Sequence, residues 1–231
     1  MSLLARRAIA ELAGTAFLVM AVVGSGIMAS RLSPNDTGLA LLENSVATGA
    51  ALVALIVALQ PVSASFNPVV TLVEKMLGLV GWRTAGALIL AQFVGGLAGT
   101  VVANAMFGLD AVALSSHART GSGLWLGEIV ATVGLLLVVF GTVRSGRADR
   151  VAFAVGGYIA AAYWFTSSTS FANPAVTLAR TVTNTFAGIA PASAPAFMLA
   201  QLIGGALGFI LIRLLYPAGI TASTPEKEVI S

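Results

Sequence analysis

The pattern Asn-Pro-x-Val-Thr-Leu occurs twice in this chain, at residues 67–72 and at residues 173–178. Asn is a favoured N-cap residue and Pro suits the first position of a helix, so each copy predicts the start of a helix. The two helices, expected at 67–77 and 173–184, have about three turns each, whereas crossing a bilayer takes roughly 20 apolar residues. The motifs therefore predict two half-helices whose free N–H groups and capping Asn side chains face a polar ligand.

The composition places these half-helices inside a membrane. Of the 231 residues, 58% are hydrophobic and 9% are charged, whereas about a quarter of the residues in a soluble domain are charged. The fold class predicted is all-α: a polytopic membrane protein with six transmembrane helices plus the two half-helices, in a single domain over residues 1–231. The six apolar stretches cover residues 8–29, 39–61, 84–106, 124–143, 151–168 and 195–216. The fifth is the shortest and ends in a polar run at 166–170.

The two halves of the chain repeat one another. The first repeat is expected over residues 1–110 and the second over 120–217, followed by a polar tail at 218–231. Three crossings in each repeat invert the second copy, which is the architecture of membrane proteins with a site at the bilayer midplane. The two motif Asn residues are then expected to meet near the bilayer centre from opposite sides. The matched pairs are Glu11 with Glu128, Asn67 with Asn173, and Gln92 with Gln201.

Basic residues gather on one side of this predicted topology. With both termini in the cytoplasm, nine Lys and Arg residues face the cytoplasm and three, Arg31, Arg119 and Arg180, face outward. This bias follows the positive-inside rule. We therefore expect a multi-pass protein of the cell inner (plasma) membrane, with the lipid bilayer as a partner. Because the basic residues stand at segment ends, the pI near 9.8 does not indicate nucleic-acid binding.

The residue inventory argues against an enzyme. The chain has no Cys and a single His, His117, in a predicted loop. It therefore offers no thiol or His metal site and no Ser/His/Asp or Cys/His arrangement for nucleophilic catalysis. We expect no catalytic residue, no metal and no cofactor.

Two acidic side chains lie deep in predicted spans. A bare carboxylate inside a bilayer costs several kcal/mol, so Glu11 and Glu128 each need a partner. We interpret them as structural buried carboxylates that accept hydrogen bonds from the unpaired N–H groups of the loops carrying the half-helices. The alternative is a protonated Glu that faces a neighbouring helix.

With these features, the sequence resembles the aquaporin, or major intrinsic protein, family over nearly its whole length. The doubled Asn-Pro-Ala-like motif, the Glu in spans one and four, and the inverted three-span halves carry the resemblance. It implies a homotetramer in which each protomer has its own pore for water or small uncharged solutes. Asn67 and Asn173 take the place of the two pore asparagines, whose amides donate to a passing oxygen. The other motif positions are Pro68, Val69, Pro174 and Ala175.

The sequence departs from the water-selective pattern of this family at the narrow outer filter. Val176 follows the second motif where the family usually carries the pore Arg, and Ser170 stands three residues before that motif. In the second span, Thr48, or else Ala47, aligns where water channels often carry Phe. The fifth-span position, often His, falls within residues 161–164. We take the selectivity filter as Thr48, Tyr163, Ser170 and Val176.

Val and Thr in place of a guanidinium and an aromatic ring are expected to make the filter wider and less polar. Val69, in place of the Ala of the first motif, adds a small steric change at the midplane. We predict a passive channel for glycerol-like polyols, neutral metalloid acids such as arsenite and antimonite, and water, similar to a bacterial branch of glycerol facilitators and arsenic-resistance-associated aquaglyceroporins. A water-selective aquaporin is the alternative within the family. A secondary active transporter is the alternative from another class, although both deep acids already have a structural explanation.

Two charged residues occupy matched positions beyond the motifs. Glu74 and Arg180 each follow their motif Asn by seven residues. Helical spacing puts Arg180 one turn past Val176, toward the outer vestibule. Arg180 is expected either to supply some of the positive charge that Val176 lacks and so discourage cations, or to be a structural residue bound to loop carbonyls.

Overall fold

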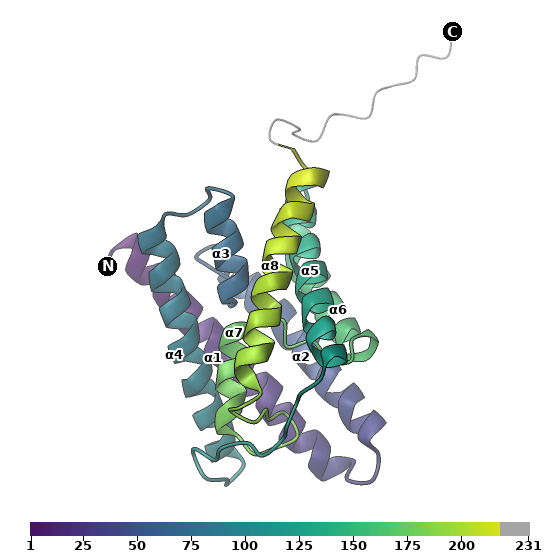
Figure 1. The fold of residues 1–231 in the computed structure, drawn as a ribbon. Helices are drawn as coiled ribbons and strands as arrows, with labels where there is room; N and C mark the ends of the chain where they lie inside the picture. The colour runs from purple at the N-terminus through teal and green to yellow at the C-terminus, as the bar shows by residue number, and fades with distance from the viewer. Residues whose placement is uncertain (218–231) are drawn as a thin grey trace.

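The computed structural model describes residues 1–217, so the predicted polar tail at 218–231 lies outside the described residues. Over that range the regular structure is entirely helical, as predicted, and two short helices lie between six longer ones (Figure 1). The long helices are α1 (Leu3–Leu32), α2 (Thr37–Leu59), α4 (Trp82–Met106), α5 (Ser122–Arg144), α6 (Val151–Phe165) and α8 (Ala194–Leu215), and the short ones are α3 (Pro68–Met76) and α7 (Pro174–Ala179).

Five of the long helices, α1, α2, α4, α5 and α8, are long and apolar enough to cross a membrane. The remaining one, α6, has 15 residues and ends at Phe165, three residues before the predicted end of the fifth span. The polar run explains the early end. Thr166 has extended backbone, and its side-chain hydroxyl donates a hydrogen bond to the Ala162 carbonyl at 2.7 Å. Ser167 donates to the Gly123 carbonyl at 2.7 Å, so this run forms a loop that leads into α7.

Both half-helices begin at the predicted residues. The side chain of Asn67 caps α3 by accepting from the Val69 N–H at 2.9 Å. The side chain of Asn173 caps α7 by accepting from the N–H groups of Ala175 and Val176, at 3.0 and 3.2 Å. Pro stands in the first turn of each helix, where no intrahelical donor is lost.

The second half-helix is shorter than the predicted range 173–184. Its α-helical part, α7, ends at Ala179, and the 3₁₀ turn η2 (Arg180–Val182) follows. Tertiary hydrogen bonds explain this end. The carbonyls of Thr181 and Val182 accept from the backbone N–H groups of Ser115 and Ala113, at 3.0 and 3.1 Å, so they cannot continue a helix.

Glycines bring the long helices into close contact in matched pairs. Helix α1 packs against α4, and α5 packs against α8. A Cβ at Gly95 or Gly99 would lie 2.3 Å from the carbonyl oxygen of Leu12 or Ala16 on α1. A Cβ at Gly204 of α8 would lie 2.8 Å from the Ile129 carbonyl oxygen on α5. These small residues therefore allow backbone approach between crossing helices.

The N-terminus and the C-terminal end of α8 lie toward the same side of the bundle (Figure 1). Six crossings require this arrangement. We call this side, which includes Arg7 and the linker at 145–150, the termini side. The other side, which includes the connections at 107–121 and 183–193, is called the loop side.

Candidate functional site

The two motif Asn residues meet at the centre of the bundle. The Asn67 side-chain amide donates to the Ala172 carbonyl at 2.7 Å, and the Asn173 amide donates to the Phe66 carbonyl at 2.7 Å. Each motif is therefore held by the loop of the other. Because a side-chain amide carries two N–H donors, one donor on each Asn remains for a ligand.

The residues directly before these asparagines have left-handed backbone. Phe66 has φ of 48° and Ala172 has φ of 49°, a conformation that costs about 1–3 kcal/mol for a residue with a side chain. Both N–H groups are held by buried carboxylates. Phe66 donates to Glu11 at 2.7 Å, and Ala172 donates to Glu128 at 2.8 Å.

Each buried carboxylate joins its loop to a neighbouring helix. Glu11 also accepts from the Ser65 N–H at 2.8 Å and from the Gln92 amide at 2.8 Å. Glu128 accepts from the Phe171 N–H at 2.9 Å and from the Gln201 amide. Both Glu side chains are fully buried. Hydrogen bonds to loop N–H groups agree with the first of the two interpretations of these acids, namely struts for the half-helix loops.

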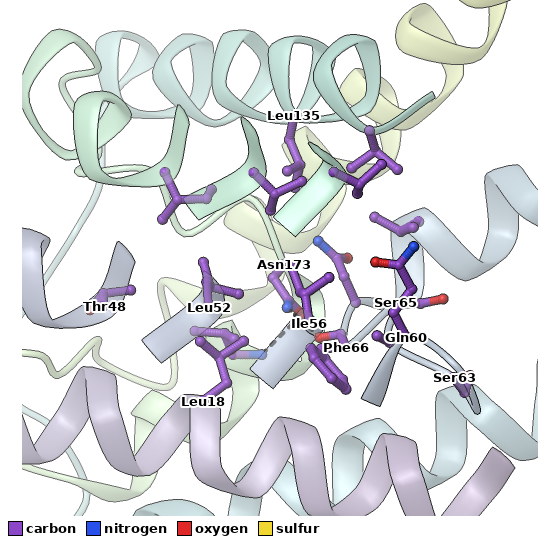
Figure 2. A pocket seen from close by; sticks show the side chains of 18 of the residues that line it. Leu18, Thr48, Leu52, Ile56, Gln60, Ser63, Ser65, Phe66, Leu135 and Asn173 are labelled. Atoms are coloured by element: carbon purple, nitrogen blue, oxygen red, sulfur yellow. Dashed lines mark hydrogen bonds between the residues drawn. The ribbon is translucent and has the colours of Figure 1, made fainter. Parts of the chain in front are cut away.

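A cavity of about 290 Å³ runs along the bundle past both asparagines. Its lining extends from Arg7 and Gln60 on the termini side to Arg180 on the loop side. Figure 2 shows Ser65 and Thr48 toward opposite ends of this cavity, with Asn173 between them. Much of the remaining wall is aliphatic, including Leu18, Leu52, Ile56 and Leu135. The arrangement is a narrow apolar path with two amide donors near its middle.

All four predicted filter residues line this cavity. Thr48, Tyr163, Ser170 and Val176 are each at least 95% buried. The Thr48 hydroxyl lies 3.3 Å from the Tyr163 hydroxyl, so α2 and α6 meet at this level. The alternative position, Ala47, lines a separate hollow near Phe107.

Arg180 also lines the cavity and is bound to its wall. Among the described residues, the guanidinium donates one hydrogen bond, from Nε to the Ala187 carbonyl. Its central carbon lies 3.4 Å from the centre of the Phe171 ring. Arg180 therefore faces the cavity and also binds a loop carbonyl, so both alternatives for this residue stay open.

A second guanidinium supports the same wall from outside the cavity. Arg119, in the connection between α4 and α5, lies 5.2 Å from the centre of the Phe171 ring and donates from Nε to the Gly188 carbonyl at 3.0 Å. Burial lowers the pKa of Arg119 from its ordinary value. Sequence reasoning assigned no role to Phe171 or to Arg119. Phe171 stands two residues before Asn173, and this aromatic residue beside the second motif is the sequence feature that could have pointed to such a contact.

The remaining motif positions do not line the cavity. Pro68, Pro174 and Ala175 are buried but are not part of the cavity lining. Val69 faces α8, where a Cβ built on Gly205 would lie 2.7 Å from Cγ1 of Val69. The added bulk of Val69 therefore meets α8 and does not enter the cavity.

Six long helices, two half-helices that meet end to end, and a cavity that passes their N-termini define a membrane channel protein. The chain belongs to the major intrinsic protein family, whose model matches residues 1–151 and again residues 142–229. Proteins of this family are channels and not enzymes, which confirms the prediction against catalysis.

Individual relatives support this assignment. The chain is 49% identical to Aquaglyceroporin AqpS of Rhizobium meliloti (strain 1021), over 96% of this chain and 97% of that protein. It is 31% identical to Aquaporin NIP1-1 of Zea mays, over 67% of this chain and 55% of that protein. The solved structure of the aquaglyceroporin from Plasmodium falciparum superposes with a TM-score of 0.72 at 17% identity, covering 93% of this chain and 98% of that one. At this identity the superposition supports the fold alone.

Proposed function

We propose that this protein is a passive channel for glycerol-like polyols, neutral hydroxylated metalloid acids such as arsenite and antimonite, and water. The observation that carries the proposal is the cavity past Asn67 and Asn173, whose filter level holds Val176 and Thr48. A side chain of three carbons leaves more room there than an Arg would. The similarity to a protein named an aquaglyceroporin, over nearly the full length of both chains, supports the same solute class.

Selection for neutral solutes follows from the centre of the path. The N-termini of α3 and α7 both point at this centre and carry partial positive charge, which opposes the passage of cations. The free amide donors of Asn67 and Asn173 bind a hydroxyl oxygen of the solute. Aliphatic side chains along the wall suit the carbon face of a polyol. Two donors on one side and apolar groups on the other match a molecule with hydroxyls along one edge.

The orientation of the channel in the membrane follows from the distribution of its basic residues. We assign the termini side to the cytoplasm of a cell inner (plasma) membrane, because most Lys and Arg residues lie on that side of the predicted topology. We also propose that the protein is a homotetramer with one pore in each protomer, as in the family that it belongs to.

The test of this function is stopped-flow light scattering of proteoliposomes under a glycerol gradient. Wild-type protein is expected to give water efflux followed by re-swelling much faster than in empty liposomes, because the filter admits the polyol. An Asn173→Asp variant, which removes one of the two central amide donors, serves as a control. Fast shrinking without re-swelling would assign the protein to water-selective channels instead.

Replacing Val176 with Arg is expected to lower glycerol permeability by about tenfold or more, equal to about 1.4 kcal/mol of added barrier. The long guanidinium would enter the cavity beside Thr48 and Tyr163, where Val176 presents only a short aliphatic side chain. The measurement is the re-swelling rate in the same liposome assay. Val176→Ala is the matched control and should retain glycerol flux. Wild-type flux in Val176→Arg would contradict the assignment of the filter.

Replacing Arg180 with Ala is expected to produce a measurable potassium leak, because the cavity loses a fixed positive charge. Arg119→Ala is the matched control. Arg119 binds the same Phe171 ring and the same loop but lies outside the cavity lining. Potassium flux into proteoliposomes, measured with an entrapped fluorescent indicator, compares the two variants. Equal leaks would mean that Arg180 acts only through the loop.

A further inference from the structure

The cavity also contains an acidic residue that the proposed function does not use. Glu74 lies in the last turn of α3 and lines the cavity on its termini side. Its position in the first half corresponds to that of Arg180 in the second, seven residues beyond the motif Asn. At a rise of about 1.5 Å per residue, the Cα atoms of both residues lie about 10 Å along the chain axis from the central asparagines, in opposite directions.

The Glu74 carboxylate has few partners in the protein. The Ser65 hydroxyl lies 3.1 Å from both of its oxygens, and within the described residues these are its only hydrogen bonds. The charged neighbours are Arg7, on α1, and the buried Glu11. Ser65 is itself fixed, because its backbone N–H donates to Glu11 at 2.8 Å. Ser65 therefore holds the carboxylate in place at the cavity wall.

Stability does not account for an acid at this position. The C-terminal turn of a helix carries partial negative charge, so a carboxylate there is unfavourable. Partial burial and the nearby Glu11 add a further cost, which the Ser65 hydrogen bond and the charge of Arg7 offset in part. A residue that lowers stability and faces the cavity is a candidate for a role in transport.

The other charged groups of the cavity lining are positive. The N-termini of α3 and α7 point at its centre, and the other charged side chains in its lining are Arg7 and Arg180. Within the described residues, Glu74 is the sole acid of that lining. A path with positive potential along its full length repels cations but attracts small anions.

We propose that the Glu74 carboxylate, held by Ser65, is a charge barrier that keeps small inorganic anions out of the pore. Arg180 opposes cations on the loop side and Glu74 opposes anions on the termini side, so neutral solutes alone pass both. The carboxylate also accepts hydrogen bonds from the hydroxyls of a passing polyol. This inference rests on the proposed function, since it requires a pore that is open to solutes.

The test measures anion entry directly. Proteoliposomes are placed in a potassium nitrate gradient with valinomycin, which carries potassium, so that osmotic swelling reports nitrate entry. Glu74→Gln keeps the size and the Ser65 contact but removes the charge, and it is expected to raise nitrate permeability by about tenfold or more over wild type. Asp149→Asn is the matched control, because Asp149 is an exposed acid on the termini side outside the cavity. It is expected to leave nitrate entry unchanged.

Two further measurements separate the possible failures. Water efflux under sucrose shows that each variant is folded and open, and Glu74→Asp, which keeps the charge, is expected to exclude nitrate. Nitrate entry at the wild-type level in an open Glu74→Gln channel would overturn the proposal, and so would equal entry in Glu74→Asp and Glu74→Gln. Failure of the wild type to carry glycerol would instead overturn the proposed function, because the nitrate assay does not depend on polyol transport.

Discussion

Replacing Glu128 with Leu is expected to prevent recovery of the folded channel from detergent. The carboxylate accepts hydrogen bonds from the N–H groups of Phe171 and Ala172 and from the Gln201 amide. Leu would leave these three buried donors without a partner and would release Ala172 from its left-handed backbone. Each buried donor left without a partner costs about 1–3 kcal/mol, so the loss of all three is a large fraction of the stability of a domain.

The measurement is the yield of monodisperse protein in size-exclusion chromatography, followed by thermal unfolding. Glu128→Gln is the matched control and is expected to cost less, because its amide oxygen still accepts one of the loop donors. Native yield and unchanged melting temperature in Glu128→Leu would mean that the loop is held by other contacts. The strut interpretation of both acids would then be abandoned.

Replacing Gly99 with Val is expected to separate α1 from α4 and to abolish a stable fold. A Cβ at this position would lie 2.3 Å from the Ala16 carbonyl oxygen and 3.0 Å from its carbonyl carbon. The backbone of α1 cannot change rotamer as a flexible side chain can, so α1 or α4 must move as a whole. Overpacking costs about 1–3 kcal/mol at sites that can relax, and this contact offers no such relaxation.

Gly86→Val on the same helix is the matched control. A Cβ at Gly86 meets nothing within 4 Å, so the substitution changes propensity without a clash. Thermal unfolding in detergent compares the two variants, and Gly86→Val is expected to melt close to wild type. Equal melting temperatures would contradict the view that the close crossing of α1 and α4 stabilises the bundle.

Features that depend on local chemistry could be predicted from the sequence. Each Asn-Pro pair specifies a helix start through its own capping groups, and both helices begin where predicted. Five of the six predicted crossings follow from the length and apolarity of their own stretches, because a bilayer core selects for about 20 apolar residues in a row. The doubled pattern also implied that Asn67 and Asn173 would meet, because inversion brings equivalent positions to one centre.

Other features depend on contacts between distant segments, and the tertiary structure alone decided them. The left-handed backbone of Phe66 and Ala172 exists because Glu11 and Glu128 hold it, from 55 and 44 residues away. The second half-helix stops at Ala179, and the carbonyls of the next three residues accept hydrogen bonds from Ile189 and from the connection at 107–121. The helix propensity of a segment depends on its own residues and therefore cannot predict hydrogen bonds to distant segments.

The cavity lining shows the same division. The resemblance to the family could limit the fifth-span filter position to residues 161–164, and only the packing of α6 against α2 brings Tyr163 beside Thr48. The sequence by itself determined the helices, their inverted order and the two central amide donors, since each follows from residues close in the chain. The tertiary structure decided which side chains face the cavity, because the direction of a side chain depends on the orientation of its helix and on the angle at which helices cross.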